Sequence, residues 1–123
     1  MTLSMDKIPL SSRLAQITEY WDPKIVAELN GQHVKLAKVK GEFIWHHHQD
    51  EDELFLILKG HLTIHLRDRV VELDEGDCFV IPKGVEHKPE AKYETHILMF
   101  EPVGTLNTGN IENERTRSSP KRI

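Results

Sequence analysis

Glycine, proline and short polar clusters interrupt this chain so often that no long helical period fits into it. The short pieces between these interruptions have the pattern of β-strands with turn signals on either side. Many short strands separated by turns predict an all-β sandwich or barrel. One short helix is expected near the N-terminus, over residues 11–19. The expected strands are residues 24–29, 34–39, 42–48, 53–59, 62–67, 70–73, 78–81 and 95–100.

The run from Leu54 to Leu58 is apolar at every position. Because successive side chains of a strand point to opposite faces, both faces of this strand must be covered. The interior of a barrel covers only one of them. Trp21 and Trp45 also have no evident place in a core. We therefore expect a homodimer in which a second copy covers this apolar surface.

The length of 123 residues suits one domain with an ordinary hydrophobic core. We expect a barrel domain with an N-terminal extension over residues 1–104. Residues 105–123 are mostly polar, with few strongly apolar side chains. Such a composition cannot bury enough surface to build a core, so it predicts an extended or disordered C-terminal tail. An arm that crosses a dimer partner is the alternative.

Charge and composition exclude several classes of protein. Sixteen basic and twenty acidic residues give a net charge of −4, which argues against binding to nucleic acid. No apolar run approaches the ~18 residues that span a membrane. Cys78 is the single cysteine, so an intramolecular disulfide is excluded. No apolar stretch follows Lys7, so we expect no secretory signal and a cytoplasmic location.

Histidines and one glutamate form the most informative pattern. If residues 42–48 are a strand, His46 and His48 lie side by side on one face, ~6.5 Å apart along the strand. A polar turn then brings Glu53 back beside them at the start of the next strand. A Pro-x-Gly turn delivers His87 to the same interior. Three neutral imidazoles and one carboxylate predict a site for a divalent metal ion.

Other polar residues near this pattern have competing interpretations. His47 lies between the two proposed ligands but faces away from them. Glu51 or Asp52 replaces Glu53 as the carboxylate if the turn is shorter than expected. His65 and His96 are the candidates for a catalytic acid or base, because free imidazole titrates at a pKa of ~6.5. The alternation around His65 favours instead a position outside the core.

The full spacing of these residues resembles the two signature motifs of the cupin superfamily. Four residues separate Gly41 from His46 where that family has five, and Ala91 stands where the second motif ends in asparagine. The resemblance covers roughly residues 34–102. It implies a jelly-roll β-barrel and an ion held by residues matching His46, His48, Glu53 and His87. The other residues that match the motifs are Gly60, Gly76, Pro82 and Gly84.

The resemblance implies several functions, because cupins include oxygenases, decarboxylases, isomerases and proteins without enzymatic activity. We expect one divalent transition metal per chain, with manganese, iron or nickel favoured and zinc or copper possible. Four protein ligands in an octahedral shell leave positions open for a small molecule. We expect a metal-dependent enzyme acting on a small oxygen-rich organic acid or ketone. The alternative is a metal-dependent protein that binds or senses a small molecule without turnover.

Overall fold

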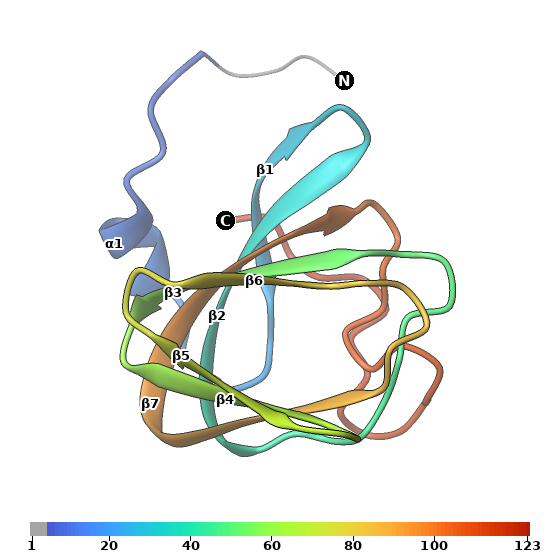
Figure 1. Cartoon of the computed structure of the whole chain (residues 1–123). Coiled ribbons are helices and arrows are strands. Elements are labelled where there is room, and N and C mark those ends of the chain that lie inside the picture. Colours follow the sequence, from blue (N-terminus) through green and yellow to red (C-terminus); the bar gives the residue numbers. More distant parts are fainter. Residues whose placement is uncertain (1–4) are drawn as a thin grey trace.

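A curled antiparallel β-sheet makes up most of the molecule, as the computed structural model shows for residues 5–123 (Figure 1). This confirms the expected all-β class. None of the helices in this described part is long and apolar enough to cross a membrane. The elements are α1 (Leu10–Leu14), β1 (Lys24–Leu29), β2 (Gln32–Glu42), β3 (Glu53–Lys59), β4 (His61–Leu66), β5 (Val70–Asp74), β6 (Cys78–Ile81) and β7 (His87–Pro102).

The long strand β7 joins the two halves of the sheet. Its C-terminal part pairs with β2 on one side and β3 on the other, in the order β1-β2-β7-β3-β6. We call this part the β3 half-sheet. The N-terminal part of β7 pairs with β4, which pairs with β5. We call this part the β4 half-sheet. The two half-sheets curl toward each other and enclose an interior, as in a jelly-roll barrel (Figure 1).

Side chains that alternate along the strands fill this interior. Leu62 and Ile64 of β4 are fully buried, and Ile57 of β3 and Ile97 of β7 lie opposite each other in register. Each large apolar side chain removed from water contributes roughly 1.5–3 kcal/mol to stability. The buried cluster contains Ala37, Val39, Phe55, Ile57, Leu62, Ile64, Leu73, Ile81, Ala91, Ile97 and Met99.

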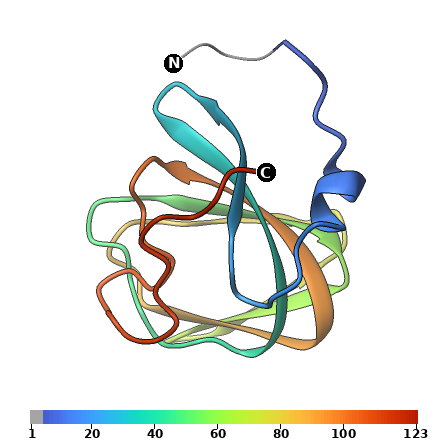
Figure 2. The ribbon, with the colours of Figure 1, turned by 180° about the vertical axis from the view of Figure 1, so that it is seen from behind.

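Helix α1 covers part of the outer surface of the β3 half-sheet. Leu14 and Ile17 pack there against Leu36 of β2, which is fully buried. The helix ends at Leu14, earlier than the expected residue 19. The chain leaves the helical path there, and Ile17 lies against Leu36 with 2% of its surface exposed. Seen from behind, the C-terminus crosses β1 and ends on the side of the β1–β2 hairpin where α1 lies (Figure 2), and Ile123 packs against the same apolar cluster.

Residues 42–48 do not form the regular strand that the sequence predicted. Strand β2 ends at Glu42, and the following segment contains only an isolated bridge between His46 and His87. A positive φ of 83° at Gly41 and a register shift between Val39 and Gly41 redirect the chain before it reaches the histidines. The burial nevertheless alternates, and His46 and His48 are each 3% exposed.

Residues 105–123 differ from the expected extended or disordered tail. They fold back over the barrel in a series of turns (Figure 2). The amide oxygen of Asn107 accepts a hydrogen bond from the Arg117 N–H at 2.8 Å, and Thr108 is fully buried. At the end, the N–H of Ile123 donates to the carbonyl of Ile25 in β1. Polar side chains satisfy the backbone of this segment, so it packs without a core of its own.

Candidate metal centre

The segment that carries His46 and His48 is held along both of its edges. On one edge, His46 and His87 exchange two backbone hydrogen bonds of 3.0 and 2.9 Å. On the other edge, the N–H of His47 donates to Asn110 Oδ1 at 2.9 Å, and the N–H of Asn110 donates to the His47 carbonyl at 3.0 Å. The segment thus behaves as a short strand between β7 and the C-terminal segment. This fixes the direction of both histidine side chains.

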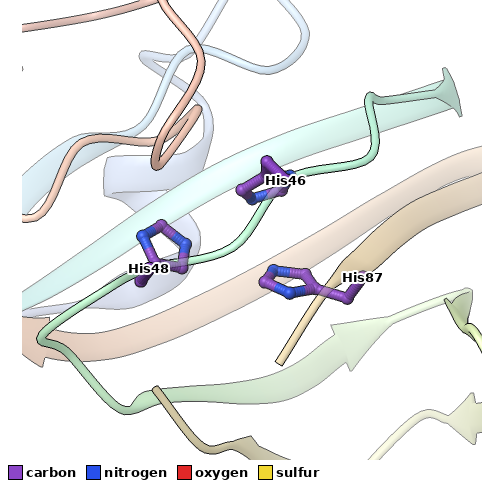
Figure 3. Close-up of side chains that lie close together, drawn as sticks. All are labelled: His46, His48 and His87. Carbon is purple, nitrogen blue, oxygen red and sulfur yellow. The ribbon is translucent and has the colours of Figure 1, made fainter. Parts of the chain in front are cut away.

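Three histidine rings meet in the barrel interior (Figure 3). His46, His48 and His87 each offer a nitrogen, and these nitrogens lie within 4.8 Å of one another. The side chains of His46 and His48 come from the segment before β3, and His87 opens β7. All three residues are at most 3% exposed. Such a group of buried nitrogens can hold a metal ion.

Hydrogen bonds orient two of these rings. Nδ1 of His46 lies 2.9 Å from the carbonyl oxygen of Ile44, and Nδ1 of His87 lies 2.9 Å from that of Val85. Because a carbonyl only accepts, each Nδ1 carries the proton and each Nε2 keeps a free lone pair. This is the arrangement by which metal-binding histidines are usually oriented. The sequence placed the histidines but did not predict these carbonyl partners.

Several buried nitrogens at this site have no hydrogen-bond partner within residues 5–123. They are Nε2 of His87 and both ring nitrogens of His48. A buried polar atom without a partner costs about 1–3 kcal/mol. A cation bound between the rings removes this cost, because each free lone pair then has an acceptor for its electrons. The residues present therefore fit a metal ion.

Glu53 lies beside the histidines at the first position of β3. Its Oε1 is 3.4 Å from His48 Nε2 and 3.8 Å from His87 Nε2, and the residue is 3% exposed. The alternative carboxylate Asp52 is exposed, and its Oδ1 accepts the backbone N–H of Lys83 at 2.9 Å instead. Of these two acidic residues, Glu53 is the one within reach of the imidazoles.

Burial and charge set the protonation states at the site. Burial, together with the charge of His87, lowers the pKa of His46 to about 4. Burial alone would raise the pKa of Glu53, but the neighbouring Glu101 carboxyl and the nearby imidazoles of His48 and His87 together outweigh burial and hold this pKa well below its usual range. Neutral imidazole and ionised carboxylate are the forms that bind metals. His46 and Glu53 are therefore in their metal-binding forms at neutral pH.

A second buried polar pair supports Glu53 from behind, and sequence reasoning missed it. Nζ of Lys35 lies 3.1 Å from Oε1 of Glu101, and both side chains are 2% exposed. Burial and the charge of Glu53 raise the pKa of Glu101 well above its usual range. Lys35 acts against this shift, because its charge and its contact with Glu101 favour the ionised carboxylate. Every second side chain of β2 and β7 points inward, and Lys35 and Glu101 occupy such positions. This alternation is the signal that could have revealed the pair.

The two candidates for a catalytic acid or base lie outside the barrel. His65 Nε2 is 2.7 Å from Glu90 on the outer surface of the β4 half-sheet. His96 Nε2 is 2.8 Å from Glu94, two residues away on β7. Neither side chain is among the three buried rings. The geometry gives no support to a catalytic role for either residue.

Comparison with known proteins agrees with this fold and this cluster. Residues 32–101 match the model of the cupin domain family. This chain belongs to the cupins. An uncharacterized protein of Bacillus subtilis (strain 168), YdbB, is 40% identical over 77 residues, which cover 62% of this chain and 68% of that protein. The expected family and the jelly-roll fold are thereby confirmed.

Two solved structures resemble the cupin described here. A cupin-2 domain protein from Shewanella frigidimarina NCIMB 400 is 45% identical, with a TM-score of 0.76 over 77% of this chain and 93% of its own. Protein NMB1881 from Neisseria meningitidis is 30% identical, with a TM-score of 0.72 over 79% of this chain and 99% of its own. The family match ends at residue 101, so the segment that clamps His47 lies beyond it.

Proposed function

We propose that this cupin binds one divalent transition metal ion through His46, His48, Glu53 and His87. The observation that carries the proposal is the convergence of three buried imidazoles, two of which are oriented by a carbonyl, on a buried carboxylate. Without a cation, the free nitrogens stay buried without partners. With one, His46 and Glu53 are already in the protonation states that metal binding needs.

The donor set favours manganese, iron or nickel. Three imidazoles and one carboxylate are intermediate in softness, and Cys78 is exposed on the outer side of β6 rather than near the rings. Four protein ligands leave positions open in an octahedral shell, whereas a structural zinc site uses four ligands to close a tetrahedron. Zinc and copper remain alternative occupants, and elemental analysis distinguishes them.

The proposed activity is a metal-dependent reaction of a small ketone or organic acid, by oxygenation, decarboxylation or isomerisation. A bound metal ion polarises an oxygen atom of such a molecule. The protein contributes a buried, preoriented ligand set and an apolar interior that excludes water. Lys35 and Glu101 form a buried polar pair behind Glu53. The alternative is a protein that binds the same molecule without turnover.

Elemental analysis of purified variants tests the metal site. His48→Ala should leave a folded barrel, as judged by circular dichroism, and reduce the bound metal to less than a tenth. His47→Ala is the matched control, because His47 belongs to the same segment but is not one of the clustered rings. Full metal occupancy in a His46→Ala/His48→Ala protein would contradict the assignment. Product formation from a ketone or organic acid by the metal-loaded protein then distinguishes enzyme from binding protein.

We also propose that the protein forms a homodimer through the outer surface of the β3 half-sheet. Register places Val34 beside Phe100, Phe100 beside Leu54, and Leu54 beside Val80, so four apolar side chains cross four strands in one row. Val80 is 50% exposed. An apolar row of this kind is typical of a surface that another subunit covers. Light scattering that reports a 14 kDa species at micromolar concentration would rule the dimer out.

A further inference from the structure

A small cavity lies inside the barrel next to His46 and Glu53. It measures ≈ 40 Å³. A water molecule needs at least ~10–15 Å³ of such space, so the cavity has room for about three water-sized groups. Its walls come from the inward faces of β2, β3 and β7. The apolar residues of these walls are Ala37, Val39, Phe55, Pro89, Ile97 and Met99.

Polar groups in the cavity are confined to the end at His46 and Glu53. Asn107 also lines the cavity, but its amide oxygen accepts the Arg117 N–H and its amide nitrogen donates to the Arg115 carbonyl. Among residues 5–123, no lysine or arginine contributes to the lining. A charged group placed against the apolar walls would therefore lose its hydration without gaining a partner, which is costly.

Residues outside the family match also line this cavity. Trp21 and Pro23 precede residue 32, and Asn107 follows residue 101. Trp21 is firmly held, because its indole N–H donates to the Lys40 carbonyl at 2.8 Å and its ring stacks on Phe43 with centroids 4.8 Å apart. The lining of the cavity is thus built partly by segments that the family match does not include.

We infer that the cavity receives the short, uncharged alkyl end of a ligand whose oxygen atoms bind at the metal centre. The chemical class is a ketone or 2-oxo acid with an alkyl chain of about three carbons, and dicarboxylates are excluded. Polar atoms gather at His46 and Glu53, and apolar walls fill the rest, so the cavity dictates which end of the ligand points inward. The inference rests on the proposed metal site for the polar end of the ligand, and the alkyl end rests on the cavity alone.

A pair of five-carbon ligands tests this inference directly. 2-Oxopentanoate and 2-oxoglutarate share the same oxygen donors, but the first ends in a methyl group and the second in a carboxylate. Titration calorimetry on Co²⁺-loaded protein should show at least tenfold tighter binding of 2-oxopentanoate. Failure to bind Co²⁺ would refute the metal proposal and the inference with it. Equal affinities, tighter 2-oxoglutarate binding, or no binding of either ligand to Co²⁺-loaded protein would overturn the inference alone.

Substitutions in the wall locate the alkyl end. Ala37→Val narrows the cavity and should weaken 2-oxopentanoate binding at least tenfold, while leaving Co²⁺ binding and the affinity for glyoxylate, which has no alkyl chain, unchanged. Ala91→Val is the matched control, because Ala91 is buried in the same core but does not line the cavity. Equal losses for glyoxylate and 2-oxopentanoate would contradict the inference.

An enlarging substitution gives a second test that does not depend on added bulk. Met99→Ala enlarges the cavity that Met99 lines and should improve the binding of 2-oxoheptanoate relative to 2-oxopentanoate by at least fivefold. Circular dichroism confirms that each variant is folded. An unchanged ratio of the two affinities in folded Met99→Ala protein would show that the alkyl chain lies elsewhere, and would overturn the inference.

Discussion

In the β4 half-sheet, the strand β4 places apolar side chains inside and polar ones outside. Leu62 and Ile64 are fully buried in the core, whereas Thr63 and His65 hydrogen-bond to Glu72 and Glu90 on the outer surface. This is the distribution expected of a sheet with one side in the core and the other in water. Burial of apolar surface is sufficient to account for it.

The β3 half-sheet reverses this distribution near the metal centre. Lys35, Glu53 and Glu101 point inward and are at most 3% exposed, while their neighbours Leu54 and Phe100 point outward. Burying charged groups is unfavourable unless they are paired, so stability alone does not explain the reversal. The comparison supports the proposals that the β3 half-sheet binds a metal ion on its inner face and a second subunit on its outer face.

Lys35→Met should have the largest effect on stability, because it leaves Glu101 without its buried partner. We expect the free energy of unfolding to fall by about 3–5 kcal/mol, measured by urea denaturation. Lys88→Met is the matched control on the other half-sheet, where Lys88 pairs with the exposed Glu42 at 3.0 Å. A change of less than about 1 kcal/mol is expected there.

A double substitution sharpens this result. Lys35→Met combined with Glu101→Leu removes both members of the pair and should recover most of the lost stability, because two apolar groups of similar volume need no partner. A double variant that is no more stable than Lys35→Met would show that the pair is not the source of the loss. The placement of charged side chains inside the β3 half-sheet and apolar side chains outside it would then need another explanation.

The C-terminal segment pairs with the segment that carries His46 and His48, and a substitution at Gly109 tests this support. A Cβ at Gly109 would lie 2.1 Å from the His47 carbonyl oxygen and 3.1 Å from the His46 ring, so Gly109→Ala must displace the ligand segment. We expect a stability loss of about 2–3 kcal/mol and at least tenfold weaker metal binding, measured by competition with a chelator. Gly104→Ala is the control, because its φ is also positive but nothing lies within 4 Å of the added Cβ. Metal affinity should be unchanged in that variant.

Substitutions of two exposed valines allow the outer surfaces of the two half-sheets to be compared. Val80 on β6 and Val70 on β5 are 50% and 51% exposed, so lysine at either position should leave the monomer folded. If the β3 half-sheet forms the dimer interface, Val80→Lys raises the dissociation constant at least tenfold, since it buries a charge between two subunits. Val70→Lys should have no effect. Analytical ultracentrifugation measures both, and equal behaviour of the two variants would contradict this choice of surface.

The parts of the site that the sequence predicted best are those that depend on short spacings between residues. His46 and His48 are two residues apart, and a turn of four residues separates them from Glu53, so local geometry limits where these side chains can lie. The Lys35–Glu101 pair was missed because its members are far apart in sequence and meet only through the register of β2 and β7. The clamp on His47 was missed because its hydrogen bonds come from polar residues without any hydrophobic period.

Acidification should change the stability contributions of an inward and an outward histidine in opposite directions. His33 points inward on β2, and burial lowers its pKa despite its hydrogen bond to Glu28. The unfolded chain therefore takes up a proton at His33 before the folded protein does, so this residue makes the protein less stable as the pH falls below ~6.5. His61 points outward on β4, and hydrogen bonds to Glu72 and Asp74 raise its pKa. Its contribution to stability is fully present below ~6.5 and is lost as the pH rises through the raised value.

We expect His33→Gln to reduce the loss of stability between pH 7 and 5, and His61→Gln to lower stability at pH 5 more than at pH 8. Urea denaturation of the protein in a chelator, at each pH, measures both differences relative to the parent chain. Differences of the same sign for the two variants would show that the inward and outward histidines of the two half-sheets do not experience opposite environments.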